Sequence, residues 1–100
     1  MPVKTDYQND TLTAQLQGDI DHHTAAAMRE AIDRAAEGCL PKHLVLDFSG
    51  VSFMDSSGVG LVMGRYRLIR SMGGTLTVTG ASPRIRAMMK LAGLDLLTQS

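Results

Sequence analysis

The stretch "HLVLDFSGVSFMDSSGVGLVMGRY", His43 to Tyr66, decides the fold, because a strand pattern passes into a helix pattern within it. Its first six residues, "HLVLDF", are short, apolar and β-branched, which is typical of a strand covered on both faces or central in its sheet. Two serines follow, and apolar residues then recur at helical spacing, at Val59, Val62, Met63, Tyr66 and Ile69. The serine pair therefore stands where a strand ends and a helix begins.

The rest of the chain continues this alternation of strands and helices. Strand and helix patterns, together with turn residues and caps, place every further element. The predicted elements are strands 3–7 and 11–17 joined at Asn9 and Asp10, the second ended by Gly18; a helix between Asp21 and Gly38, closed by Gly38; the strand 43–48; a helix stopped by Gly73 and Gly74; the strand 75–80; a helix with Ser82 before Pro83 and Gly93 after; and a short element 94–97. The order ββαβαβα predicts an α/β fold, a mixed sheet with helices packed on it.

The length and composition limit the chain to one ordinary globular domain. One hundred residues make a single domain, 1–100, and 44% hydrophobic residues with four aromatics predict an aliphatic core. No run approaches the roughly 18 apolar residues of a membrane span, and the first ten residues lack the layout of a signal peptide. The single Cys39 cannot form an internal disulfide. We expect a cytoplasmic protein without a membrane partner.

The charges are balanced overall but unevenly distributed along the chain. Up to Asp55 there are four basic and nine acidic residues, whereas from Ser56 onward there are six basic residues and one acid. The net charge of zero argues against a nucleic-acid partner. The basic second half is either a set of solvated helix faces or a face that docks on an acidic partner.

The serine pair is either a helix cap or a pair of exposed hydroxyl groups with a chemical role. A serine nucleophile needs a base and an oxyanion hole. The G-x-S-x-G elbow is absent, because Met54 stands two residues before Ser56 and Asp55 two before Ser57. The sequence therefore predicts no hydrolase site.

The histidines offer little support for catalysis or metal binding. His22 and His23 are adjacent in a strand-to-helix loop, where imidazoles are more often plain surface residues. Together with Cys39 or His43 they match no known zinc or facial-triad spacing. We therefore expect no catalytic residue, no metal and no cofactor.

Three glycines follow the serines, and packing is the favoured explanation for them. They are spaced too widely for a dinucleotide fingerprint, and the lysine of a phosphate loop is missing. We expect Gly60 and Gly64 to let the helix approach the sheet, and Gly58 to leave backbone amides uncovered. Those amides and the helix dipole favour negative charge, so the serine pair sits where a phosphoryl group is tolerated.

The stretch "LVLDFSGVSFMDSSGVGLVMGRY" resembles the signature of STAS-domain anti-sigma-factor antagonists. "GDIDHHTA", Gly18 to Ala25, resembles the first strand-to-helix loop of the sporulation member of that family, and the resemblance covers Leu12 to Leu97. One departure is that the family usually continues into a further C-terminal helix, whereas this chain stops at Ser100. The surface which that helix covers elsewhere is then expected to be exposed here.

The resemblance implies a regulatory binding protein and not an enzyme. In the family, the serine directly after the acid is phosphorylated, which here is Ser56, and Ser57 is not the acceptor. The unphosphorylated antagonist binds an anti-sigma factor that is also a serine kinase, which frees a sigma factor; phosphorylation inactivates the antagonist, and a phosphatase resets it. The residues expected to bind the partner are Asp21, His22, Asp55, Ser57, Gly58, Gly60, Arg65 and Arg67.

A second interpretation belongs to another functional class. STAS modules also serve as accessory domains of transporters or sensors, or bind a nucleotide, without being phosphorylated. A kinase of the anti-sigma type and a sigma factor encoded beside the gene would favour the antagonist interpretation.

Overall fold

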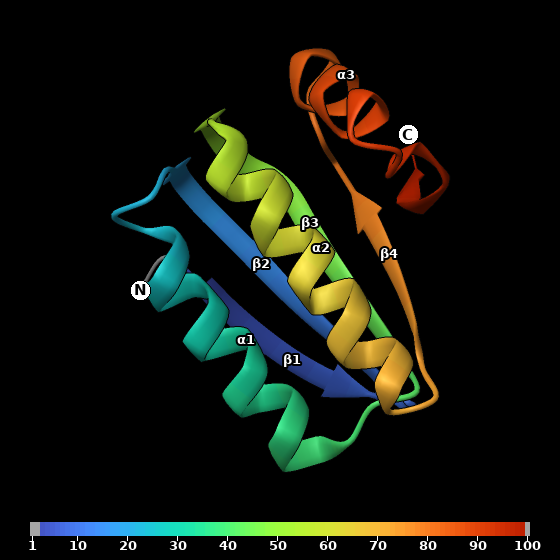
Figure 1. Ribbon diagram of the computed structural model, residues 1–100. Helices are drawn as coiled ribbons and strands as arrows, with labels where there is room; N and C mark the ends of the chain where they lie inside the picture. Colours follow the sequence, from blue (N-terminus) through green and yellow to red (C-terminus); the bar gives the residue numbers. More distant parts are fainter. Residues whose placement is uncertain (1–2, 100) are drawn as a thin grey trace.

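The computed structural model describes residues 3–99 and contains one five-stranded sheet with α1 and α2 over the same face (Figure 1). The strand order is β1-β2-β3-β4-β5; β1 is antiparallel to β2, and the other neighbours are parallel. The elements are β1 (Val3–Gln8), β2 (Thr11–Ile20), α1 (Ala25–Cys39), β3 (His43–Met54), α2 (Ser56–Ser71), β4 (Thr75–Thr79), α3 (Pro83–Leu91), the 3-10 helix η1 (Asp95–Leu97) and β5 (Thr98–Gln99). The mixed α/β sheet and the order ββαβαβα are confirmed, and β5 was not foreseen.

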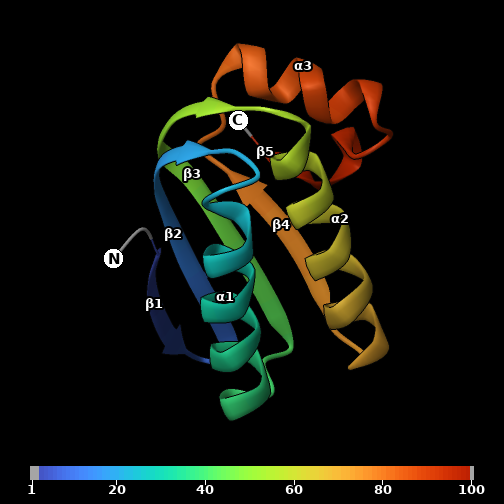
Figure 2. The ribbon, with the colours of Figure 1, turned by 60° about the vertical axis from the view of Figure 1, so that its left-hand side comes forward.

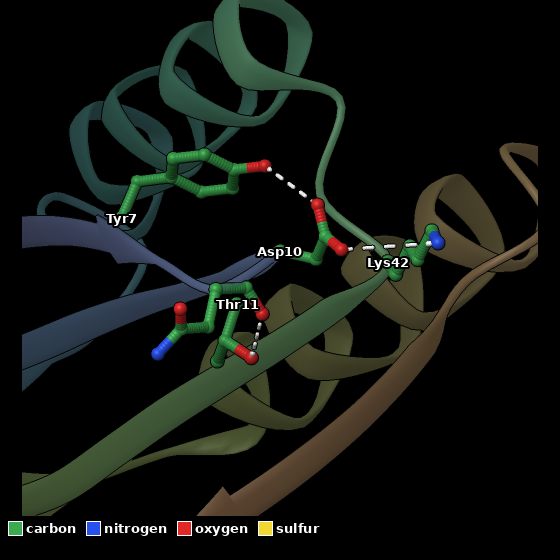
Figure 3. Close-up of polar contacts among 5 residues, drawn as sticks. Tyr7, Asp10, Thr11 and Lys42 are labelled. Carbon is green, nitrogen blue, oxygen red and sulfur yellow. Dashed lines mark hydrogen bonds and ion pairs between the residues drawn. The ribbon is translucent and has the colours of Figure 1, made fainter.

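The turn between β1 and β2 anchors the start of β3 (Figure 3). Asn9 and Asp10 have φ angles of 52° and 63°, as the tight hairpin turn between twisted strands requires. The Tyr7 hydroxyl donates to Asp10 Oδ1 over 3.3 Å, and Lys42 Nζ lies 3.8 Å from Asp10 Oδ2. The backbone amides of Lys42 and His43 both donate to the Asp10 carbonyl. The predicted joint at Asn9 and Asp10 is confirmed.

The core lies between the sheet and the helices α1 and α2. Alternate side chains of the central strands are buried, among them Leu12, Ala14, Leu16, Leu44, Leu46, Phe48, Leu76 and Val78. Between them, Val45 and Thr77 are only half-buried. Of the two alternatives predicted for this strand, a place at the centre of the sheet is confirmed, because β3 lies between β2 and β4. Its β-branched residues pack against neighbouring strands on the open face.

The helices bury one stripe each. α1 buries Met28, Ile32 and Ala36. The buried stripe of α2 runs through Leu61, Val62, Arg65 and Ile69. It is rotated from the predicted stripe, because Val59, Met63 and Tyr66 lie at its margin and are only partly buried. A search for apolar residues alone misses the buried stripe, because Arg65 occupies one of its positions.

Two strands extend further than predicted because bulges let their pairing resume. Register shifts in the β2–β3 ladder occur between Gln15 and Gln17 and between Gly18 and Asp19. Gly18, with a φ of 85°, is part of this irregularity and does not end the strand. β2 therefore reaches Ile20, and β3 reaches Met54 instead of ending at residue 48.

The helix ends match the predicted caps in one case and differ in another. Ser82 Oγ accepts the amide of Ile85 over 3.2 Å at the start of α3, with Pro83 in the first position, as predicted. At the end of α1, Gly38 lies inside the helix, and Leu40 takes the left-handed conformation with a φ of 48°. Within the described residues, no helix is both long and apolar enough to cross a membrane.

Candidate functional site

The ends of β2 and β3 bring two loops to one edge of the sheet (Figure 2). Ile20 and Met54, the last residues of these strands, are paired in the parallel ladder. The Asp55 amide continues this pairing by donating to the Ile20 carbonyl over 3.1 Å. The residues that follow the two strands, Asp21 after β2 and Asp55 after β3, are therefore neighbours. At this edge each loop leads directly into a helix.

The loop before α1 is closed by its own hydrogen bonds. Asp21 Oδ1 accepts the amides of His23 and Thr24 over 2.9 and 3.0 Å. In return, the Asp21 amide donates to the Thr24 hydroxyl oxygen over 3.0 Å, so that each side chain accepts the other residue's backbone amide in the turn before α1. The amide hydrogen bond from Thr24 is the largest of the influences that hold the pKa of Asp21 below its ordinary value. This loop is fixed by groups that satisfy one another.

The start of α2 is capped but leaves a hydroxyl group available. Asp55 is the N-cap, and its Oδ1 accepts the Ser57 amide over 2.8 Å. Ser56 is the first helical residue and is exposed, whereas Ser57 is half-buried. Within residues 3–99, no hydrogen bond holds the Ser56 hydroxyl. An acidic group attached there would meet the positive end of the helix dipole.

Gly58 is the glycine that packing requires. A Cβ at this position would overlap the Met54 side chain and lie 3.3 Å from Cγ2 of Ile20. By contrast, a Cβ on Gly60 or Gly64 would have no atom within 4 Å. The prediction for these three glycines was therefore reversed, because Gly58 is buried against the two strand ends and the other two face open space.

That open space is part of a groove between α1 and α2, which we call the α1–α2 groove. Its volume is about 370 Å³. It begins at His22 and Ser57, beside the exposed serine, and Gly60 and Gly64 form its α2 side. Four of the residues predicted to bind a partner therefore share one groove: His22, Ser57, Gly60 and Arg65.

Arg65 does not lie on an exposed basic face, although it belongs to the basic half of the chain. Its side chain is only 9% exposed, and its Nε lies 2.7 Å from Oδ1 of Asp33 on α1. The distance is that of an ion pair, but the N–H is not directed at the carboxylate oxygen as a hydrogen bond requires. Arg65 is therefore not part of an exposed basic face, whereas Arg67 is exposed and places Nη2 3.7 Å from Sδ of Met63.

Burial opposes both charges of this pair. It lowers the pKa of Arg65 and raises the pKa of Asp33, and in each case it outweighs the attraction of the partner. Arg29, one turn before Asp33, also reaches the α1–α2 groove. Neither Arg29 nor Asp33 was among the predicted site residues. A sequence signal for Asp33 does exist. Arg65 falls in the helical stripe of positions 61, 62, 65 and 69, and a buried arginine requires an acidic partner on the helix that it faces.

The remaining candidates do not form a metal or catalytic cluster. Among residues 3–99, no group of three or more His, Cys, Asp or Glu side chains is arranged to hold a metal ion. His22 and His23 lie with their ring centroids 3.9 Å apart and the rings tilted by 38°. The chemistry that the edge offers is thus one exposed hydroxyl, a capping carboxylate on either side and a groove with two arginines.

Three comparisons with known proteins agree with this architecture. The family model "STAS domain" matches residues 2–98. The chain is 33% identical over 94 residues to an anti-sigma F factor antagonist of Paenibacillus polymyxa, covering 94% of this chain and 80% of that protein. It resembles the structure of the anti-sigma factor antagonist SpoIIAA in its unphosphorylated form, with a TM-score of 0.85, 31% identity and coverage of 97% of this chain and 85% of that one.

The structure of SpoIIAA in its phosphorylated form, from Bacillus, is similar as well, with a TM-score of 0.79, 31% identity and coverage of 97% and 88%. The family match spans nearly the whole chain, and the resemblance noted in the signature stretch and the capped loop agrees with it. This chain belongs to the STAS domain family.

Proposed function

We propose that this chain is an anti-sigma factor antagonist that a serine kinase switches off at Ser56. In its unphosphorylated form it binds an anti-sigma factor that is also the kinase, and a sigma factor is thereby released. A phosphatase that removes the phosphate restores binding. The names of its relatives support the antagonist role, and the exposed start of α2 supports the switch.

The observation that carries the proposal is the exposed Ser56 hydroxyl on a capped helix start. Asp55 holds the Ser57 amide, so that the first turn is formed before any partner arrives. Ser57 is half-buried and lines the α1–α2 groove, whereas Ser56 is exposed. A kinase can therefore reach Ser56 Oγ without unfolding the helix.

The proposed reaction is a simple phosphoryl transfer. Ser56 Oγ forms a bond to the γ-phosphorus of the kinase's ATP, the bond from that phosphorus to the β–γ bridging oxygen breaks, and the hydroxyl proton leaves to a base. The products are phosphoserine and ADP. The domain itself supplies only the acceptor and its position.

The phosphate would act through its charge. It adds about −1.5 to −2 charges at neutral pH. The charge arrives beside Asp55 and the neighbouring Asp21 loop, where the dipole of α2 offsets it within the domain. The amides of Ser57 and Gly58 already donate to Asp55, so the expectation that they are uncovered was wrong. The partner's site already accommodates nucleotide phosphates, so the added anion repels it while the fold persists.

The test is to incubate the chain with the anti-sigma factor kinase of the same genome and ATP, and to locate the phosphate by mass spectrometry. We expect modification of the wild type and of Ser57→Ala at residue 56, and none on Ser56→Ala. Ser56→Ala should still fold and bind the kinase, because the N-cap of α2 is Asp55 and the Ser56 hydroxyl makes no hydrogen bond within residues 3–99. Full phosphorylation of Ser56→Ala would refute the assignment, and an unbound, unmodified wild type would favour the accessory-module interpretation.

A further inference from the structure

The guanidinium of Arg65 has more donors than the protein provides acceptors for. Arginine carries five N–H donors in a fixed planar fork. Nε faces Asp33, but among the described residues the guanidinium donates no well-directed hydrogen bond to any acceptor. Because Nε is buried and has no hydrogen-bond partner, this unmatched donor costs free energy. Arg65 also lines the α1–α2 groove.

The groove itself carries positive charge without a carboxylate of its own. Arg29 and Arg65 line it, together with His22, and none of its lining residues is acidic. Asp33 lies behind Arg65, at the side of the adjoining hollow where Glu30, Arg34 and Glu37 are also found. The lining of the α1–α2 groove therefore contains two arginines and no carboxylate, whereas the acids Glu30, Asp33 and Glu37 line the adjoining hollow that the same two arginines share. An anionic group that enters the groove would meet two positive charges there.

The walls of the groove suit a protein segment. Ala25 and Ala26 form the α1 side, and Gly60 and Gly64 leave the α2 backbone uncovered. Small residues on both sides let another backbone approach closely. The two arginines of the groove favour an acidic side chain on that backbone. A planar carboxylate matches the fork of a guanidinium in a bidentate way.

We propose that the anti-sigma partner inserts an acidic side chain, Asp or Glu, into the α1–α2 groove, where its carboxylate binds Arg65 and Arg29. This rests on the proposed function and extends the contact from Ser56 along the groove. The segment that carries the acid lies over Gly60 and Gly64. The contact with Ser56 senses phosphorylation, and the groove supplies recognition of the partner.

The first experiment fills the groove without disturbing the fold. Gly64→Leu places a side chain in open space on α2, and Gly38→Leu is the matched control, because Gly38 is also helical with nothing near its Cβ but lies outside the groove. We expect Gly64→Leu to weaken binding of the anti-sigma factor kinase by about tenfold or more, as blocking a central contact does. Gly38→Leu should bind as the wild type does, and neither variant should melt at a lower temperature.

The second experiment identifies the acid. Arg29→Glu should weaken the complex by about tenfold, while Lys90→Glu on α3, an exposed charge reversal far from the groove, should change it less than about twofold. A scan of Asp→Lys and Glu→Lys variants of the partner should then yield one that restores binding to Arg29→Glu but weakens binding to the wild type.

The outcomes separate this inference from the proposed function. If the wild type binds and is phosphorylated but Gly64→Leu and Arg29→Glu bind equally well, the groove inference fails and the proposed function stands. If the wild type neither binds nor is modified, both fail. Binding of ATP or GTP alone to the groove, detected by amide shifts that Gly64→Leu abolishes while the partner still binds that variant, would overturn the docking inference in favour of a nucleotide site.

Discussion

The starts of α1 and α2 lie side by side after paired strand ends, but the first is closed by its own hydrogen bonds and the second presents an exposed hydroxyl. Each follows a strand end, Ile20 or Met54, and each has an aspartate that accepts backbone amides. At α1, Asp21 and Thr24 satisfy one another's backbone groups, and the loop is closed. At α2, Asp55 accepts one amide and the next residue presents an exposed hydroxyl.

One edge of the sheet therefore carries a closed loop and an open helix start side by side. The loop before α1 is held by its own hydrogen bonds. Under the proposed function, a phosphate at the open start would add negative charge beside this loop. Changes to either start should consequently have different effects, and the following predictions run from the largest to the smallest.

The largest effect is expected from Gly58→Ala. The new Cβ would overlap the buried Met54 side chain, and overpacking of this kind costs about 1–3 kcal/mol of unfolding free energy. Chemical denaturation monitored by circular dichroism measures it. Gly60→Ala is the matched control two residues on, where open space and helix propensity should raise the stability by about 0.5–1 kcal/mol. Equal effects at the two positions would contradict the packing role of Gly58.

Removal of the open cap should have the next largest effect. Asp55→Ala loses the acceptor of the Ser57 amide and should cost about 1 kcal/mol of unfolding free energy. Asp55→Asn keeps an acceptor and should recover most of it. A matching loss in both variants would mean that the carboxylate charge, and not the cap, holds the start of α2.

The contribution of Asp21 to stability should disappear in acid, because it depends on the charge of the carboxylate. The pKa of Asp21 is lowered in the folded state, so its carboxylate stabilises the fold above its ordinary pKa and that stabilisation is lost as the pH falls through the folded value. Wild type should therefore be more stable than Asp21→Asn near neutral pH, and the two should converge in acid below the ordinary range of the carboxyl. Thermal melts from neutral pH into acid test this, and a gap that persists in acid would contradict it.

Asp33, between the two helices, should show the opposite sign. Burial raises its pKa in the folded state, so the folded chain binds the proton more tightly than the unfolded chain does. Wild type should gain stability relative to Asp33→Asn as the pH falls from neutral through the folded pKa. At neutral pH the two should differ by less than about 1 kcal/mol, since burial and the attraction of Arg65 act on the Asp33 carboxylate in opposite directions. A clear loss of stability in Asp33→Asn at neutral pH would show that attraction outweighs burial.

The smallest effect is expected at Arg67. This residue is exposed, so Arg67→Glu should leave the stability within about 0.5 kcal/mol of the wild type. If the basic half of the chain steers association, the variant should associate more slowly with the anti-sigma factor kinase, and the difference should shrink as salt is added. Stopped-flow kinetics at two salt concentrations measure the association rate. Rates that do not depend on salt would indicate that Arg67 interacts only with the dipole of its own helix.

Much of the fold was predictable because its signals are local. Ser82 and Pro83 cap α3, Asn9 and Asp10 form the hairpin turn, and the strand and helix periods fix the order of the elements. The ends of β2 and β3 were not predictable. Their last residues alternate poorly in burial, and their pairing depends on bulges that only the neighbouring strand reveals.

The junction of strand and helix was predictable, but its N-cap is Asp55 and not one of the two serines. Ser56 as the phosphate acceptor comes from the resemblance to the family and stays a prediction. Gly58 and Gly60 could not be told apart from spacing, since the difference is the Met54 side chain beneath one of them. Arg65 was expected on the surface because its acid, Asp33, lies on another helix.

The central claim is that phosphate at Ser56 prevents binding through local charge, and calorimetric titration of the two forms tests it most directly. The anti-sigma factor kinase, without ATP, is titrated into unphosphorylated chain and into chain phosphorylated at Ser56. We predict tight binding of the first and binding weaker by about a hundredfold or more for the second, since clustered like charges at an interface cost several kcal/mol. Equal affinities for the two forms would contradict the account.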